Sequence, residues 1–84
     1  MNVQDTVLEH AQKILDRDDV TLDDDFFEVG GDSLVGMHFV GRVGRAVDLP
    51  VRMTLLFSYP VLRDFAAEVE ALRKQAEADG VTEA

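Results

Sequence analysis

Residues 26–37 read FFEVGGDSLVGM, and the interpretation of the whole chain starts from this stretch. Two phenylalanines lead into two glycines, which are followed by Asp32, Ser33 and the start of a helical apolar pattern. Glycine lets a backbone turn tightly and leaves room for a second molecule to approach. The stretch therefore predicts a serine at the tip of a turn, at or next to the N-cap of a helix.

Helical spacing of apolar residues covers most of the remaining chain. It predicts a first helix over residues 3–15, a second over 33–47, a short one within 53–58 and a last helix with Pro60 in its first turn. Residues 16–32 lack a helical period and predict a long loop that packs its own apolar side chains onto the body. These side chains are Val20, Leu22, Phe26, Phe27 and Val29. The fold class is all-α: a small four-helix bundle with a long first loop and a short third helix.

The second helix separates into faces at about 100° per residue. Its core side should hold Phe39, Val40, Val43, Ala46 and Val47. A polar stripe carries His38, Arg42 and Arg45, and the flank turned from the core centre carries Leu34, Met37, Gly41 and Gly44. We expect Phe26 or Phe27 to anchor the long loop, and the core to centre on Phe39, Val43, Phe65 and Val69.

The chain of 84 residues is long enough for one small domain. We expect residues 1–75 to form it and residues 76–84 to be a flexible C-terminal tail. The sequence has no cysteine, no signal peptide pattern and no apolar run of membrane-spanning length. A cytoplasmic location is therefore expected, and Met1 together with the lack of a Pro/Ala-rich linker indicates a stand-alone protein.

The net charge is −9, from 8 basic and 17 acidic residues, which disfavours nucleic acid as a partner. Eight of the acids fall in residues 16–32: Asp16, Asp18, Asp19, Asp23, Asp24, Asp25, Glu28 and Asp32. This run lacks the spacing of a calcium-binding loop, so we interpret it as a solvated loop and expect no metal site.

Ser33 lacks the surroundings of a catalytic nucleophile. A reactive serine needs a base within hydrogen-bond reach, but His38 lies about 140° around the helix from it, and nothing places His10 nearby. No G-x-S-x-G elbow is present either. Two interpretations remain open: a serine that only caps a helix, and a serine that another enzyme modifies. A phosphate attached there would be favoured by the helix N-terminus.

The run DDDFFEVGGDSLVGM, residues 23–37, resembles the signature of carrier proteins that hold intermediates on a 4′-phosphopantetheine arm. Its G-G-D-S-L core looks most like the peptidyl carrier (thiolation) branch of nonribosomal peptide synthetases. LPVRMTLLFSYPVLRDFA, residues 49–66, is similar to the family's short third helix and the start of its fourth. The resemblance covers residues from about 3 to 74 and implies the fold of acyl carrier proteins.

The resemblance implies that Ser33 is the attachment point of 4′-phosphopantetheine, with Gly31 and Asp32 beside the arm. A phosphopantetheinyl transferase would add the arm from coenzyme A, which explains why this chain carries no base. The protein would be a monomeric, non-catalytic carrier of an aminoacyl or peptidyl thioester. Its other partners would be an adenylating or loading enzyme and condensation, tailoring or thioesterase enzymes. Leu34 and Met37 match positions that touch partners, and Gly41 and Arg45 are expected to join them.

Two features depart from the family pattern. The polar stripe of the second helix is basic, which argues against a fatty acid role and for partners with neutral or acidic surfaces. The same helix contains Gly36, Gly41 and Gly44, which either allow close packing or let a partner approach the backbone. Two alternatives to the peptidyl carrier stay open: a polyketide-type acyl carrier protein, and an unmodified helical interaction module.

Overall fold

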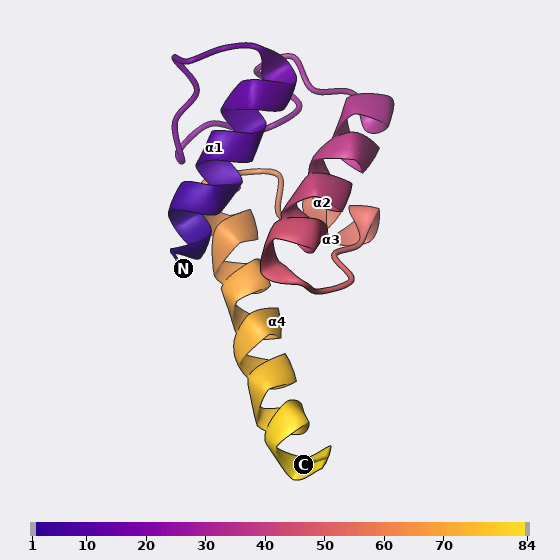
Figure 1. Cartoon of the computed structure of the whole chain (residues 1–84). Helices are drawn as coiled ribbons and strands as arrows, with labels where there is room; N and C mark the ends of the chain where they lie inside the picture. Colours follow the sequence, from indigo (N-terminus) through magenta and orange to yellow (C-terminus); the bar gives the residue numbers. More distant parts are fainter. Residues whose placement is uncertain (1, 84) are drawn as a thin grey trace.

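The computed structural model describes residues 2–83, and its regular elements are four helices. They are α1 (Val3–Leu15), α2 (Ser33–Val47), α3 (Met53–Ser58) and α4 (Leu62–Glu83), as Figure 1 shows. α1 packs against α2 and α4, and α3 packs against the same two helices. In the described range, β-type pairing is limited to one isolated bridge between Asp25 and Val61. The predicted all-α bundle with a long first loop and a short third helix is confirmed.

The ends of α1 and α2 agree with the sequence pattern because each has a capping residue. Asn2 caps the start of α1, where its side chain accepts a hydrogen bond from the Asp5 N–H at 3.2 Å. Asp16 and Asp48 end α1 and α2 in the left-handed conformation, with φ of 53° and 58°. Aspartate tolerates this conformation better than most side chains, and Pro50 then prevents the helix from resuming.

The last helix differs from the prediction at both ends. α4 begins at Leu62, so Pro60 precedes the helix instead of lying in its first turn. The Pro60 carbonyl accepts a hydrogen bond from the Phe26 N–H at 2.8 Å, and the Leu62 N–H donates to the Asp24 carbonyl at 3.0 Å. These bonds tie the approach to α4 to the long loop, a tertiary constraint that helix periodicity does not contain.

At its other end α4 continues helically through residues 76–83, where the sequence predicts an irregular tail. Arg73 forms ion pairs with Glu70 and Glu77 on the helix surface, at 3.5 Å each, and alanine and glutamate favour helix here. Figure 1 shows this end of α4 extending beyond the other helices. The division into a 1–75 domain and a flexible 76–84 tail stays a prediction, and Ala84 lies outside the described residues.

Three phenylalanine rings contact one another in a row through the core. The Phe26 ring lies 4.7 Å from the Phe39 ring at an interplanar angle of 19°, and Phe39 lies 5.4 Å from Phe65. The predicted centre of the core is confirmed, because Phe39, Phe65, Val43 and Val69 are all fully buried. Phe26 is the loop's anchor, since it is also fully buried whereas Phe27 is only partly buried. Ala46 was predicted in the core but is only half-buried.

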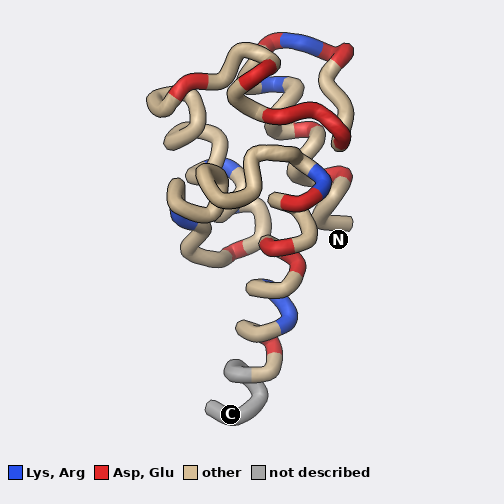
Figure 2. The backbone as a smooth tube through the Cα atoms, turned by 180° about the vertical axis from the view of Figure 1, so that it is seen from behind, with Lys and Arg blue, Asp and Glu red and all other residues tan. Residues whose placement is uncertain are grey.

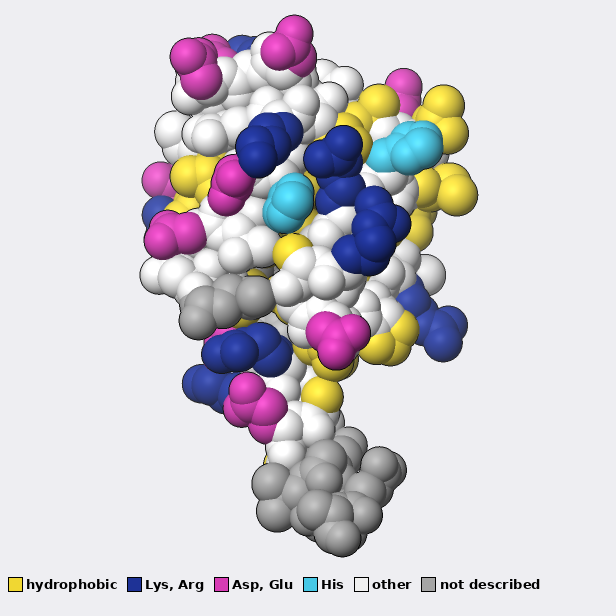
Figure 3. Space-filling model, viewed as in Figure 1, with side chains coloured by type: hydrophobic (Ala, Val, Ile, Leu, Met, Phe, Trp, Pro, Cys, Tyr) yellow, Lys and Arg dark blue, Asp and Glu magenta, His cyan; other side chains and the backbone are white. Residues whose placement is uncertain are grey.

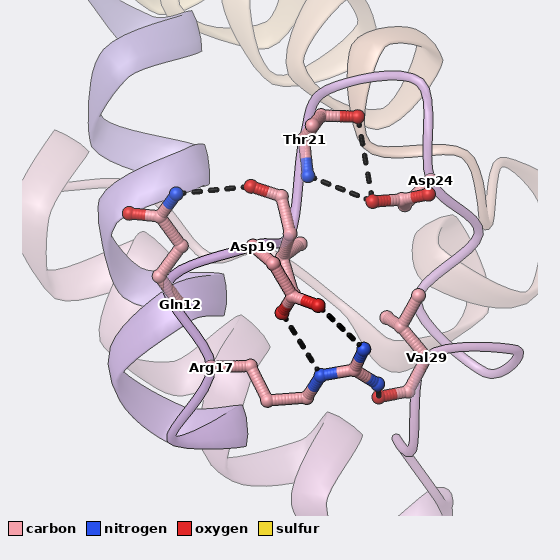
Figure 4. Close-up of polar contacts among 7 residues, drawn as sticks. Gln12, Arg17, Asp19, Thr21, Asp24 and Val29 are labelled. Carbon is pink, nitrogen blue, oxygen red and sulfur yellow. Dashed lines mark hydrogen bonds and ion pairs between the residues drawn. The ribbon is translucent and has the colours of Figure 1, made fainter.

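The loop of residues 16–32, where Figure 2 shows acidic residues gathered, is held by its own polar contacts (Figure 4). Arg17 donates to both carboxylate oxygens of Asp19, at 3.1 and 2.9 Å, and to the Val29 carbonyl at 3.0 Å. The hydrogen bond from Arg17 lowers the pKa of Asp19 below its usual value. Gln12 on α1 donates to the Val20 carbonyl at 2.9 Å. These contacts fold the loop back onto α1.

The loop also packs apolar side chains inward, as predicted. Val20 and Phe26 are buried, and Leu22, Phe27 and Val29 are partly buried against the core. Among the described residues, no cluster of three or more acidic or histidine side chains is arranged to hold a metal ion. No helix in the described part of the chain has the length and apolar character needed to cross a membrane.

Close packing explains two of the three glycines in α2. A Cβ at Gly44 would lie 2.7 Å from the Leu49 carbonyl oxygen, and one at Gly36 would lie 2.5 Å from the Met53 methyl carbon. Gly44 is buried, so of the two alternatives that the sequence leaves open, close packing holds at this position. At Gly41 an added Cβ would meet only an Arg45 guanidinium nitrogen at 3.7 Å, an ordinary contact distance. Packing therefore does not require glycine at position 41.

We predict that Phe26→Ala lowers the free energy of unfolding by about 3–5 kcal/mol, the usual range for deleting a buried ring. Phe27→Ala should lower it by less, because Phe27 is only partly buried. Chemical denaturation of both variants measures the difference. Equal losses, or a larger loss for Phe27→Ala, would show that Phe26 is not the anchor.

The glycines supply a second, matched pair of variants. Gly41→Ala should raise the free energy of unfolding by up to about 1 kcal/mol, because alanine favours helix and finds open space there. Gly44→Ala should lower it, because the new methyl group would press against the Leu49 carbonyl. The same denaturation experiment compares the two, and a stabilised Gly44→Ala would contradict the packing described here.

Candidate functional site

Ser33 is the first residue of α2 and is exposed. Asp32, the residue before Ser33, is the N-cap of α2. Its carboxylate accepts a hydrogen bond from the Val35 N–H, and its carbonyl accepts one from the Gly36 N–H, both at 2.8 Å. Among the described residues, the Ser33 hydroxyl and the N–H groups of Ser33 and Leu34 have no hydrogen-bond partner. The helix start therefore presents one accessible hydroxyl beside two available backbone donors.

The two glycines before Asp32 place this helix start on the core. Gly30 has a φ of 113°, which side-chain-bearing residues rarely adopt. The Gly31 N–H donates to the Phe26 carbonyl at 3.0 Å. A Cβ at Gly31 would collide with the Phe26 ring and lie 2.6 Å from the Phe26 carbonyl oxygen. The turn therefore rests directly on the ring that is stacked in the core, and this contact determines where Asp32 and Ser33 lie.

Neither histidine serves Ser33 as a base in this arrangement. His10 lies on α1 and is half-buried, and this burial lowers the pKa of its imidazole, with Lys13, Arg42 and Arg45 acting in the same direction. His10 makes no hydrogen bond to Ser33 among the described residues. His38 is exposed on α2 and makes no hydrogen bond to Ser33 among the described side chains.

A phosphate ester at Ser33 fits these surroundings. An anion on the Ser33 Oγ would lie next to the free N–H groups of Ser33 and Leu34 and at the positive end of the α2 dipole. The Asp32 carboxylate already accepts a hydrogen bond from the Val35 N–H, in the first turn of α2. The site can thus hold a phosphate-linked group but has no means of its own to attach one.

Exposed hydrophobic side chains surround the helix start. Leu34 and Met37 are 65% and 59% exposed, and Phe57 on α3 is 55% exposed; we call these three residues the apolar patch. Figure 3 shows hydrophobic side chains gathered on this α2–α3 side of the molecule. The Phe57 ring stacks on Phe27 at 5.5 Å with an interplanar angle of 7°. The structure thus extends the predicted docking surface from α2 onto α3.

Phe57 was not singled out by sequence reasoning, although a signal was present. Leu55, Leu56 and Phe57 are three successive large apolar residues in a helix of six residues. A helix this short cannot turn all three toward one core. Only Leu56 is fully buried, and Phe57 points outward.

Basic side chains gather on the other side of α2, toward α1 (Figure 3). Arg45 and Arg42 are exposed there as predicted, and Gly41 is half-exposed. No ion pair of either arginine occurs among the described side chains, although acids outnumber bases in the chain by 17 to 8. The predicted partner contacts Leu34, Met37, Gly41 and Arg45 are thus all accessible, and their role in partner binding stays a prediction.

Comparison with known proteins identifies the family. Residues 5–69 match the family described as the phosphopantetheine attachment site. Phosphinothricin tripeptide synthetase PhsB of Streptomyces viridochromogenes is 49% identical over 59 residues, which are 68% of this chain and 5% of that protein. Bacitracin synthase 2 of Bacillus licheniformis is 39% identical over 59 residues, 70% of this chain and 2% of that protein. The chain thus spans 5% or less of the length of these two relatives.

A solved structure agrees with the sequence matches. A protein titled "Non Ribosomal PCP domain" superimposes with a TM-score of 0.70 at 30% identity, covering 80% of this chain and 86% of that one. Domains of this family are sites of covalent 4′-phosphopantetheine attachment, and the carrier fold is in general non-catalytic. The chain belongs to the phosphopantetheine attachment site family and is a carrier domain of the peptidyl type.

Proposed function

We propose that Ser33 carries the 4′-phosphopantetheine arm of this carrier and that the chain presents an aminoacyl or peptidyl thioester on that arm to partner enzymes. The observation that supports this most directly is the position of Ser33. It is an exposed hydroxyl at a capped helix start, it has two free amides beside it, and it lies within the family match. Asp32 and Gly31 act on the site by holding this helix start in place.

Attachment requires a second enzyme. A phosphopantetheinyl transferase supplies the base that removes the Ser33 hydroxyl proton, and Ser33 Oγ forms a bond to the β-phosphorus of coenzyme A. The phosphoanhydride bond breaks, and 3′,5′-ADP leaves with its electron pair. The bound arm supplies a thiol that holds the acyl group as a thioester. The chain is then a substrate and carrier, with no catalytic residue of its own.

The nature of the cargo follows from the relatives. The two described above are named as synthetases of a tripeptide and of bacitracin, which favours an aminoacyl or peptidyl group over a polyketide acyl group. The expected partners are an adenylating or loading enzyme and condensation, tailoring or thioesterase enzymes. The monomeric state and the cytoplasmic location remain predictions.

We predict that incubation with coenzyme A and a broad-specificity phosphopantetheinyl transferase adds one arm to the wild-type chain and none to Ser33→Ala. Intact-mass analysis measures the addition, and circular dichroism should find Ser33→Ala as helical as the wild type. A wild-type chain that stays unmodified would support the unmodified interaction module instead. A modified Ser33→Ala would mean that the attachment residue is wrong.

We predict that substitutions in the apolar patch and at the arginines of α2 affect cargo loading with different dependence on salt. Met37→Ala should weaken loading by the cognate adenylating enzyme more than Arg45→Ala does, because interface energy concentrates in a few apolar anchors. The effect of Arg45→Ala should shrink as salt rises, since exposed charges are screened beyond roughly 8 Å at 0.15 M ionic strength.

Loading rates of both variants across a salt series measure this difference, with melting temperature as the control for folding. If Arg45→Ala slows loading at every salt concentration while Met37→Ala leaves the loading rate unchanged, partners recognise the basic side of α2 instead of the apolar patch.

A further inference from the structure

α1 and α2 share a face on which basic side chains gather. We call it the basic face, and its members are His10 and Lys13 on α1 and Arg42 and Arg45 on α2. α1 packs against α2, and the charges of Lys13 and the two arginines all act on the His10 imidazole. Figure 3 shows basic side chains and a histidine together over these two helices. The polar stripe predicted on α2 is thus part of a larger face that includes α1.

The acids of the chain compensate this face only in part. Lys13 forms an exposed ion pair with Glu9 at 2.8 Å. Asp48 lines a hollow together with Arg45, but these two side chains form no ion pair in the described part of the chain. Arg42 has none there either, although the chain has 17 acids and 8 basic residues. Two guanidinium groups therefore remain available to an anion from outside the chain.

His10 lies within the basic face without a hydrogen-bonding partner of its own. It is half-buried, and its Nδ1 atom is buried with no hydrogen-bond partner among the described residues. Burial is the main cause of its lowered pKa, the cations Lys13, Arg42 and Arg45 add to the effect, and Glu9 acts in the opposite direction. The imidazole is therefore mostly uncharged at neutral pH. A carboxylate brought to this face would favour the imidazolium, because a nearby opposite charge raises the pKa of a histidine.

The basic face lies away from the modification site. At about 100° and 1.5 Å per residue, Arg42 is on the opposite flank of α2 from Ser33 and about 14 Å along the helix axis. Arg45 lies about 120° around the helix from Ser33 and about 18 Å along it. The apolar patch lies on the α2–α3 side, whereas the basic face lies toward α1 (Figure 3). A segment bound across α1 and α2 therefore leaves the Ser33 hydroxyl accessible.

Carboxylates of a short peptide segment suit this face better than a long polyanion does. A guanidinium group binds a carboxylate through two parallel hydrogen bonds. A nucleic acid or an anionic membrane would also approach the acidic remainder of the chain, whose net charge of −9 would repel it. A short acidic segment covers the basic face alone and avoids this repulsion.

We propose that the basic face of α1 and α2 is a docking site for a short segment of a partner protein that is rich in aspartate and glutamate. The carboxylates of this segment bind Arg42 and Arg45 and lie against His10. Docking does not require the arm at Ser33, so the basic face is a second recognition surface beside the apolar patch. A partner bound here leaves Ser33 and the apolar patch open to another enzyme.

The test uses the full unmodified chain and two end-blocked peptides, hexaglutamate and the uncharged hexaglutamine. Backbone amide chemical shifts are followed as each peptide is added, and the imidazole signals of His10 are titrated between pH 7.5 and pH 6. Glutamate carboxylates stay ionised over this range. We expect hexaglutamate, and not hexaglutamine, to shift the amides around His10 and Arg42 and to raise the pKa of His10. Because the bound peptide favours the imidazolium, it should bind more tightly at pH 6 than at pH 7.5.

Two arginines give a matched pair of variants. Arg42 and Arg52 are both exposed, and neither forms an ion pair among the described side chains. Arg52 lines a different hollow, between α3 and α4. Arg42→Gln should weaken hexaglutamate binding roughly two- to fivefold, the range that one exposed ion pair supplies, and Arg52→Gln should leave it unchanged. His10→Gln should remove the pH dependence of binding.

Equal losses in Arg42→Gln and Arg52→Gln would reduce the effect to net charge and overturn the docking site, as would a pKa of His10 that the peptide leaves unchanged. A short DNA duplex or anionic lipid vesicles that shift the same amides more strongly than hexaglutamate would overturn the acidic protein segment as the occupant. None of these outcomes bears on arm attachment at Ser33, which intact mass measures separately.

Discussion

The rest of the structure depends on the packing of the Phe26 ring between Phe39 in the core and Gly31 in the turn. The loop of residues 16–32 is also tied to the body by the Leu62–Asp24 and Arg63–Leu22 backbone hydrogen bonds, whereas its ion pairs are exposed and each contributes little. The Phe26 N–H also donates to the Pro60 carbonyl, so one residue connects the loop to both α2 and the start of α4. Ser33 is accessible and still fixed in position because the turn before it rests on a buried ring.

This arrangement leaves the Ser33 hydroxyl accessible at a fixed place on a small acidic chain. The acids of the loop take part in its turns and in ion pairs with Arg17 and with Arg63 of α4, while two arginines of α2 have no ion pair among the described side chains. A visiting enzyme therefore meets hydrophobic side chains on one side of α2 and positive charge on the other (Figure 3). Orientation of the encounter by charge, followed by apolar contact, is consistent with the proposed carrier role.

The sequence predicted most of this structure because its signals were local. The helices at residues 3–15 and 33–47 follow from apolar spacing and from the proline after Asp48. Pro60 was misplaced because its carbonyl pairs with Phe26, a contact 34 residues away along the chain that no local pattern contains. The role of Gly44 stayed open because a helical wheel does not indicate which flank the next loop covers. Ser33 and Asp32 were accessible to sequence reasoning through the turn and cap chemistry of G-G-D-S, whereas Phe57 required knowledge of which way α3 faces.

The Phe26–Gly31 contact holds the helix start that presents Ser33, and native-state amide hydrogen exchange of Phe26→Leu, a variant that keeps position 26 apolar, tests this role. We expect the Gly31 and Val35 amides, which bond to Phe26 and Asp32, to exchange much faster than in the wild type. The Phe65 and Val69 amides of α4 should change far less. Uniform acceleration of all these amides, or unchanged exchange at Gly31 and Val35, would show that this contact does not fix the helix start.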